Sequence, residues 1–397
     1  MPIEKVKQSA ELIKQVELFL ENGLNDNESF NTALDGEDVI DIRSLQDHEQ
    51  IYHYKASEVL FWVDRTVYLD ELDNWNGEQL KEIHAEAIQH VSESNQEAVF
   101  SDLVGLIKRK KVAPFVGAGI SAAAGYPSWE NALRQLGERL TNIDNDDVEK
   151  LISENKFLRL AQELHDASSI QLNNHVHTTF RVKPAIEANR SRIPEVIQLL
   201  SRLCSGAMVT TNFDTLIEDW FKSKGAPEFD GFLFGLQQDS NFIQKLLKGD
   251  RCLLKLHGDA SQPSTYVFTE EQYRQGYGEN EIDFRLQLPK ALRQIYISHS
   301  LLFLGCSLLQ DKTMELFKHV KEEGQFVIPE HFVLLAQSTM TNGEIDFAHK
   351  QATEERLLEI GIRPIWYSSN DNHNMLTQLL ELAVNVAENR VALRGVE

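Results

Sequence analysis

Apolar runs of strand-like length alternate with helical patterns along residues 112–367 of this 397-residue chain. Such alternation is typical of a parallel sheet covered by helices on both faces. We therefore predict an α/β fold with a Rossmann-like parallel sheet. The predicted strands lie in the segments VAPFV (112–116), GAMVTTNF (206–213), CLLKLHG (252–258), SLLFLGC (300–306), HFVLLA (331–336) and RPIWY (363–367).

The residues before the first predicted strand carry helical patterns instead. Apolar residues recur at helical spacing over residues 6–20, and two further helices are predicted over 57–72 and 78–91. We predict a mostly helical N-terminal unit over residues 1–102, with a role in oligomerisation or partner docking. Residues 103–397 would then form the sheet-containing domain.

Charge and composition exclude several classes of function. The 61 acidic residues outnumber the 39 basic ones, which gives a net charge of -22 that would repel a nucleic acid. The longest apolar stretch, residues 301–309, is shorter than the roughly 20 residues of a membrane-spanning helix. The first residues lack a secretory pattern, so we expect a cytoplasmic protein without membrane contact.

The sequence also argues against a cysteine-bound metal. The three cysteines, Cys204, Cys252 and Cys306, are too far apart for a CxxC metal pair.

A glycine-rich turn, GAGIS at 117–121, follows the first predicted strand directly. Glycines at such a turn let the backbone approach a diphosphate, and the next helix offers free N–H groups. The full GxGxxG spacing is absent, because Ala122 stands at the place of the third glycine. From this turn alone, a nucleotide site and an ordinary tight turn both remain open.

Polar residues also follow three other predicted strands. They are TTNFD at 210–214, KLHGD at 255–259 and GCS at 305–307. In a parallel sheet these segments and the glycine turn would share one rim, where ligands of such folds bind. Each has a structural alternative: Asn212 and Asp214 as helix caps, His257 as a buried histidine and Ser307 as a capping serine.

Together, these segments resemble the sirtuin superfamily, and more closely its bacterial Sir2-like branch. The matching motifs are GAGIS (117–121), TTNFD (210–214), LHG (256–258) and GCSL (305–308), in the family's order. The resemblance implies that NAD binds at this rim and is cleaved at the nicotinamide–ribose bond. Asn212 would then hold the ribose and place a water, Asp214 would bind the carboxamide, and His257 would be the general base.

The resemblance also implies a set of residues that hold the rest of NAD. The first turn would bind the diphosphate, Thr211 would line the nicotinamide pocket, and the last turn would face adenosine. Thr211 departs from the family's Gln, and Cys306 from its Thr or Ser. The implied set is Gly117, Ala118, Gly119, Ser121, Thr211, Gly305 and Ser307.

Sirtuin deacylases carry a zinc module with two CxxC pairs, which three scattered cysteines cannot form. Without that module, water is the expected acceptor, so the resemblance implies an NAD hydrolase (NADase) that uses no zinc. Similar bacterial chains act as NAD-depleting effectors in anti-phage defence and abortive infection, which implies a homo-oligomer and a partner such as a HerA-like ATPase. The alternatives are an ADP-ribosyltransferase, a deacylase, or a non-catalytic sensor of NAD or ADP-ribose.

Overall fold

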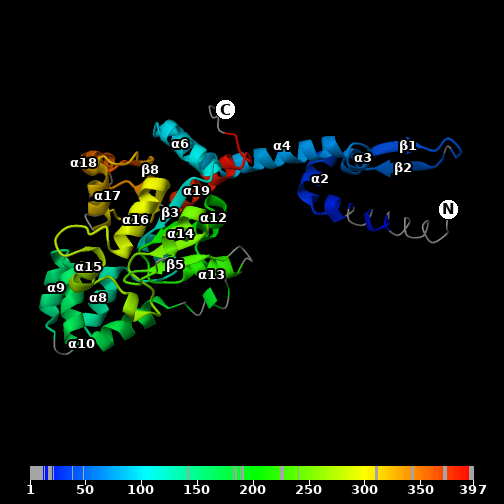
Figure 1. Ribbon diagram of the computed structural model, residues 1–397. Helices are drawn as coiled ribbons and strands as arrows, with labels where there is room; N and C mark the ends of the chain where they lie inside the picture. Colours follow the sequence, from blue (N-terminus) through cyan, green and yellow to red (C-terminus); the bar gives the residue numbers. More distant parts are fainter. Residues whose placement is uncertain are drawn as a thin grey trace. The chain divides into compact units, whose positions relative to one another are not determined.

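The computed structural model describes residues 12–392, apart from 13, 17–19, 21, 38, 48, 141–142, 182, 184–185, 188, 190–191, 224–227, 240, 309–311, 341–343 and 370–372. The helix predicted over residues 6–20 lies largely outside the described residues. The chain divides into two compact units (Figure 1). One extends to Ala85 and includes Arg390, and the other runs from Glu86 to Asn389. The assignment of separate roles to residues 1–102 and 103–397 stays a prediction.

The first unit is mostly helical, as predicted, but it also contains an antiparallel hairpin that the sequence patterns did not indicate. The helix predicted over 57–72 is interrupted at Asp64, whose carboxylate accepts a hydrogen bond from Val67 N (3.3 Å) and so caps a new helix. Phe30, Phe61 and Tyr68 form a small aromatic core. The elements are α2 (Glu28–Asp35), β1 (Ile40–Arg43), β2 (Ile51–Tyr54), α3 (Ala56–Val63) and α4 (Arg65–Ile83).

The second unit is built on a seven-stranded parallel sheet with the order β5-β6-β4-β3-β7-β8-β9. The Rossmann-like parallel sheet is therefore confirmed. Each of the six predicted segments contains a strand, and only β5 was not predicted. The strands are β3 (Val112–Val116), β4 (Met208–Thr210), β5 (Gly231–Phe234), β6 (Cys252–Lys255), β7 (Ser300–Leu304), β8 (His331–Ala336) and β9 (Ile362–Tyr367).

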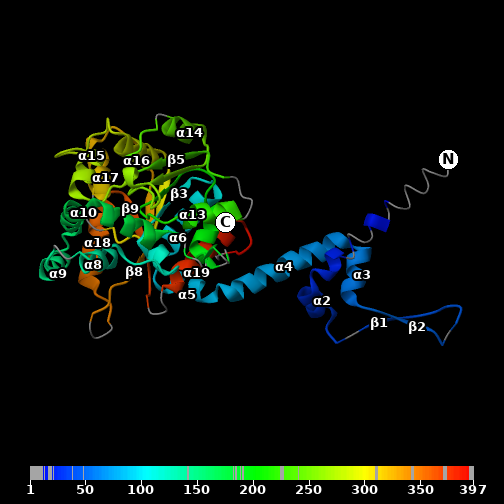
Figure 2. The same ribbon diagram turned by 90° about the horizontal axis from the view of Figure 1, so that it is seen from below.

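Helices cover both faces of this sheet (Figure 2). One face packs against α14 (Phe242–Lys248), α15 (Glu270–Tyr277), α16 (Gln287–Ser298) and α17 (Lys312–Glu323) in a large apolar core. The opposite face of the sheet is covered by α6 (Glu97–Lys108), α12 (Glu195–Leu203), α13 (Leu216–Ser223) and α19 (Asn374–Ala387). The remaining helices of the unit are α5 (Ala85–Glu93), α7 (Ala118–Ala122), α8 (Trp129–Gly137), α9 (Asn145–Ser153), α10 (Phe157–Phe180) and α18 (Phe347–Glu359).

No helix in the described part of the chain has the length and apolar character to cross a bilayer. The longest, α10, runs from Phe157 to Phe180 and carries charged and polar residues along its length.

The four predicted motifs follow the four neighbouring strands β6, β4, β3 and β7. Backbone hydrogen bonds continue past the strand ends and hold the beginnings of these loops side by side. Thr211 N donates to Val116 O (3.2 Å), Leu256 N to Thr210 O (2.8 Å) and Gly117 N to Leu304 O (2.8 Å). The predicted site residues therefore meet at the carboxyl rim of the sheet centre, where doubly wound folds bind ligands.

Candidate active site

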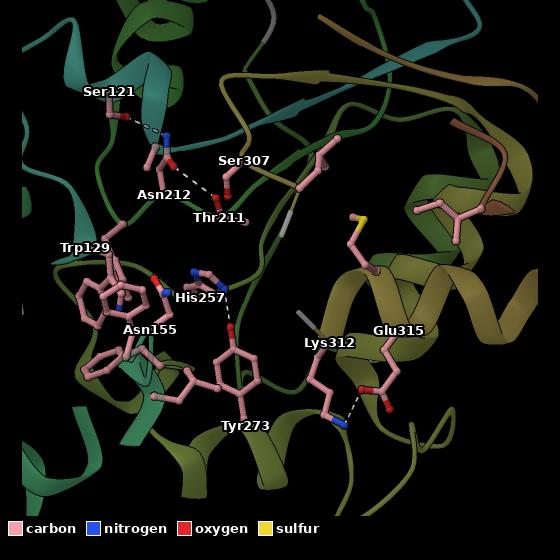
Figure 3. Close-up of a pocket in the computed structure, with 18 of the residues that line it drawn as sticks. Ser121, Trp129, Asn155, Thr211, Asn212, His257, Tyr273, Ser307, Lys312 and Glu315 are labelled. Carbon is pink, nitrogen blue, oxygen red and sulfur yellow. Dashed lines mark hydrogen bonds and ion pairs between the residues drawn. The ribbon is translucent and has the colours of Figure 1, made fainter. Parts of the chain in front are cut away.

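A cavity of about 980 Å³ opens at this rim (Figure 3). Its volume lies at the upper end of the roughly 300–1,000 Å³ of ordinary ligand pockets. Gly117, Gly119 and Gly305 do not line the cavity themselves but form the turns that support it. The predicted residues that do line it are Ala118, Ser121, Thr211, Asn212, Asp214, His257 and Ser307.

Asn212 and Asp214 are joined by the Ser121 hydroxyl in a buried network. Asn212 Nδ2 donates to Ser121 Oγ (2.8 Å) and to Gly117 O (3.0 Å), and Ser121 Oγ donates to Asp214 Oδ2 (2.6 Å). All three side chains are less than a tenth exposed. Both donor hydrogens of Asn212 are thus used within the protein, and its Oδ1, 3.4 Å from Thr211 Oγ1, is the atom left to accept a ligand hydroxyl.

Asp214 also ends the loop that leads into α13, because its Oδ1 accepts a hydrogen bond from Leu216 N (3.1 Å). Burial raises the pKa of this carboxyl, and the hydrogen bond from Ser121 offsets part of that effect. The cap predicted as a structural alternative is therefore real for Asp214, and it coexists with a place in the cavity wall.

His257 lies in the middle of the cavity and is partly exposed to it (Figure 3). Burial lowers the pKa of its imidazole to about 4, and a hydrogen bond with the Thr211 backbone opposes that shift. The ring is therefore neutral at pH 7 and able to accept a proton. Its Nε2 lies 3.0 Å from the hydroxyl of Tyr273, a residue of α15 that the sequence motifs did not single out.

The glycines of the two turns are required by contact between the turns. A Cβ on Gly117 would come within 2.5 Å of Gly305 O, and one on Gly119 within 2.9 Å of the same atom. Gly305 has a φ of +64°, and a Cβ there would lie 2.7 Å from Ile120 N. Gly119 N also donates to Gly305 O (3.0 Å). The glycine spacing that suggested a phosphate cradle thus also reflects close packing of the loops after β3 and β7.

Lys255, for which the sequence predicted no role, connects the loops that carry the site residues. Its fully buried ammonium donates to the carbonyls of Phe213 (3.2 Å) and Asp214 (2.7 Å), and to the carboxylates of Glu218 (3.0 Å) and Asp259 (2.8 Å). Burial alone would lower the pKa of Lys255, but these carboxylates outweigh it and raise the pKa. The charge ties the loop that carries Asn212 to the loop that carries His257.

Two different walls face each other across the cavity. One is aromatic: Trp129, Phe180 and Phe268 surround the Phe213 ring at centroid distances of 5.7, 5.6 and 5.6 Å. Asn155, whose φ is +55°, lies on this side and is labelled in Figure 3. The opposite wall belongs to α17 and α18 and carries charges of both signs, Lys312, Glu315, Lys318, Arg356 and Glu359.

Among the residues that the structure describes, no group of three or more His, Cys, Asp or Glu side chains is arranged to hold a metal ion. Cys204 and Cys252 are buried free thiols, and Cys306 is partly buried.

Residues 206–365 match the family described as SIR2-like domain. This range begins just before β4 and includes Asn212, His257 and Ser307, whereas the turn at 117–121 precedes it.

Among curated proteins, the chain is similar to three that are named NAD(+) hydrolase ThsA. The protein from Acinetobacter baumannii (strain 532279) is 29% identical over 216 residues, 54% of this chain and 40% of the relative. The one from Cytobacillus dafuensis is 26% identical over 224 residues, 56% and 40% of the two chains. The one from Bacillus cereus (strain MSX-D12) is 23% identical over 312 residues, 75% and 59%.

The matched regions thus span about two fifths of the first two relatives and about three fifths of the third. The family match includes the motifs TTNFD, LHG and GCSL, and the fold brings the GAGIS turn to the same rim. The resemblance to Sir2-like proteins is thus confirmed for residues 206–365, which match a SIR2-like domain.

Proposed function

We propose that this protein is an NAD hydrolase that cleaves the nicotinamide–ribose bond and releases nicotinamide and ADP-ribose. The observation that carries the proposal is the meeting of Asn212, Asp214 and His257 in one cavity of about 980 Å³ at the carboxyl rim of a parallel sheet. The similarity to proteins named NAD(+) hydrolase supports the same reaction.

Asn212 would bind the nicotinamide ribose through Oδ1, since its Nδ2 is committed to Gly117 and Ser121. Nicotinamide in NAD is already a cationic leaving group, so its departure needs little acid assistance and passes through an oxocarbenium-like state. The main task of the site is then to hold the ribose with one face of the reacting carbon open to water. A side chain fixed by two hydrogen bonds suits that task.

Asp214 would orient the carboxamide of nicotinamide, with Thr211 beside it in the same wall. A carboxylate accepts hydrogen bonds from an amide NH₂, and the Ser121 bond keeps the Asp214 carboxylate in a fixed position. His257 would act as the general base, because its neutral ring is the form that accepts a proton at pH 7.

The remainder of NAD would extend over the two glycine turns. Gly117, Ala118 and Gly119, with Ser121 behind them, would hold the diphosphate against the start of α7, and Gly305 and Ser307 would face adenosine. Ala118 and Ser307 are exposed in the cavity, which fits direct contact. The Ser121 hydroxyl is already bonded to Asn212 and Asp214, so its contribution to diphosphate binding would come from the backbone.

An enzyme that destroys NAD is harmful to its own cell and must be controlled. We assign the protein to NAD depletion in cytoplasmic anti-phage defence, with control through homo-oligomer assembly or through a partner such as a HerA-like ATPase. Residues 1–102 would mediate that assembly and residues 103–397 would carry the catalytic domain. The motif resemblance supports the assignment, and so does the helical first unit, which carries none of the cavity residues.

The test is nicotinamide release from NAD by the purified full-length chain, alone and with a HerA-like partner. His257→Ala and Asn212→Ala should each lower turnover by about 10²-fold or more, the range expected for loss of a general base or of a positioning contact. His319→Ala, a change on the exposed part of α17, should retain activity. Wild-type turnover in His257→Ala, with NAD still bound, would reject the assignment, and bound but uncleaved NAD in every case would favour the sensor alternative.

A further inference from the structure

Both ring nitrogens of His257 are engaged in the structure. One hydrogen bond joins the ring to the backbone of Thr211 and favours the protonated form, as expected when the ring N–H donates to a carbonyl. The other joins Nε2 to the Tyr273 hydroxyl at 3.0 Å (Figure 3). A neutral imidazole has one N–H and one acceptor nitrogen, so Nε2 is the acceptor and Tyr273 is the donor.

This arrangement places the Tyr273 hydroxyl at the acceptor nitrogen of the base, within the same cavity. Nε2 is the only atom of a neutral His257 that can take up a proton, and the Tyr273 oxygen already occupies its hydrogen-bonding position. Tyr273 itself lines the cavity, so its oxygen can receive a hydrogen bond from a molecule bound there. Its ring is held by stacking on Tyr277, one turn later on α15, at 5.6 Å between centroids.

We propose that Tyr273 is a further catalytic residue, whose hydroxyl carries the proton of the attacking water to His257. This inference rests on the proposed NAD hydrolysis. As the water oxygen bonds to the ribose carbon, one of its O–H bonds breaks and the proton passes to the Tyr273 oxygen. The original Tyr273 proton passes to Nε2 at the same time. Nicotinamide leaves with the electron pair of the C–N bond, so the step ends with nicotinamide, ADP-ribose, a neutral Tyr273 phenol and a His257 imidazolium.

The hydrogen bond between Tyr273 and His257 should affect the pH dependence of NAD hydrolysis. Donation from Tyr273 to Nε2 favours the neutral ring, so its removal should raise the pKa of His257 above the value of about 4 that burial produces. The acid limb of kcat/KM should then move to higher pH. The other titratable groups around the cavity are Asp214 after β4, Lys312, Glu315 and Lys318 on α17, and Arg356 and Glu359 on α18.

The variant Tyr273→Phe tests the relay in the full-length protein. It removes one oxygen and keeps the ring that stacks on Tyr277. Tyr296→Phe is the matched control, since it removes a buried hydroxyl that donates to Ile360 O (2.7 Å) and does not reach His257. The readouts are kcat and KM for NAD, the kinetic proton inventory in mixed H₂O and D₂O, and an NMR titration of the His257 ring without NAD.

We expect kcat to fall about 100-fold in Tyr273→Phe with little change in KM, in line with loss of a proton-transfer group. The proton inventory should change from curved, with two protons in flight, to linear, and the pKa of His257 should rise. A kcat equal to or above that of the wild type, or an unchanged curved inventory, would overturn the relay while leaving NAD hydrolysis in place. A wild type that releases no nicotinamide would overturn the hydrolysis, and the relay with it, irrespective of the NMR result.

Discussion

Ser121 shows how a single buried hydroxyl can organise a site. It accepts from Asn212 Nδ2 and donates to Asp214 Oδ2, and it is only 4% exposed. A buried polar atom without a partner costs about 1–3 kcal/mol, so each of these three side chains stabilises the placement of the other two. The network therefore fixes Asn212 before any ligand binds, which is the preorganisation that catalysis by positioning requires.

Ser121→Ala should expose this dependence. The Asp214 carboxylate loses the donor at Oδ2 and keeps Leu216 N at Oδ1, and the pKa of Asp214, already raised by burial, should rise further because the Ser121 bond was lowering it. We expect the free energy of unfolding to drop by about 1–3 kcal/mol and NAD turnover to drop at least about tenfold. Chemical denaturation and nicotinamide release measure the two effects. A variant with unchanged kcat and KM would show that Asn212 needs no support from Ser121.

The candidate residues at the strand ends could be predicted because each follows an apolar run directly. Asn212, Asp214 and His257 needed only the rule that parallel strands share a carboxyl rim. Tyr273 could not be found this way, since it lies in a helix and reaches His257 across 16 positions of sequence. Lys255 was visible in the KLHGD segment, but its four acceptors come from α13 and two loops, which only the tertiary structure brings together.

At the level of elements, the site depends on two turns that pack directly on each other. The loop after β3 and the loop after β7 meet through Gly117, Gly119 and Gly305, with no room for a Cβ at any of the three. Because β3 and β7 are hydrogen-bonded neighbours over five residue pairs, the turns have no freedom to move apart. Any added atom must be accommodated by distortion of α7 or of the strand ends.

Gly305→Ala has a matched control in Gly324→Ala, since both glycines have a φ of +64°. An alanine at either position carries a backbone strain of about 1–2 kcal/mol. Gly324 has nothing within 4 Å of the added Cβ, whereas at Gly305 it would meet Ile120 N at 2.7 Å. Gly305→Ala should therefore lose about 1–3 kcal/mol more stability, as overpacking does, and most NAD turnover. Equal losses of stability and activity in the two variants would contradict a role for the contact between the turns.

Fully buried strands were predicted more reliably than half-buried or exposed ones. β3 and β8 have the same bounds as the predicted runs 112–116 and 331–336, because every residue of β3 and the first four of β8 are buried between helices. β5 was missed, since it is an edge strand of which only alternate residues are buried. The hairpin of β1 and β2 was missed for a related reason: both strands are exposed along their whole length and give no burial pattern.

The candidate active site lies entirely in the second unit, and the first unit contributes no residue to the cavity. Every residue that lines the cavity belongs to the unit from Glu86 to Asn389. In the first unit, the cross-strand pairs Ile40–Tyr54 and Ile42–Tyr52 put apolar side chains on one exposed face of the hairpin, and Asp41 pairs with His53 on the other. An isolated two-stranded hairpin is marginally stable in water, so this face supports the proposed contact with a second copy of the chain.

Removal of residues 1–85 should therefore separate assembly from catalysis. The remaining chain keeps the seven-stranded sheet, its apolar core and the whole cavity, so we expect it to fold and to release nicotinamide from NAD at a rate per chain close to that of the full-length protein. Its oligomer should be smaller, because the exposed hairpin face is gone, and its activity should no longer respond to a partner.

Light scattering coupled to gel filtration measures the mass of the assembly. Ile42→Asp in the full-length chain is the control, since a charge on that face should reduce assembly without shortening the protein. An unchanged mass would remove the first unit from assembly, and a folded but inactive truncated chain would mean that the first unit contributes to the site.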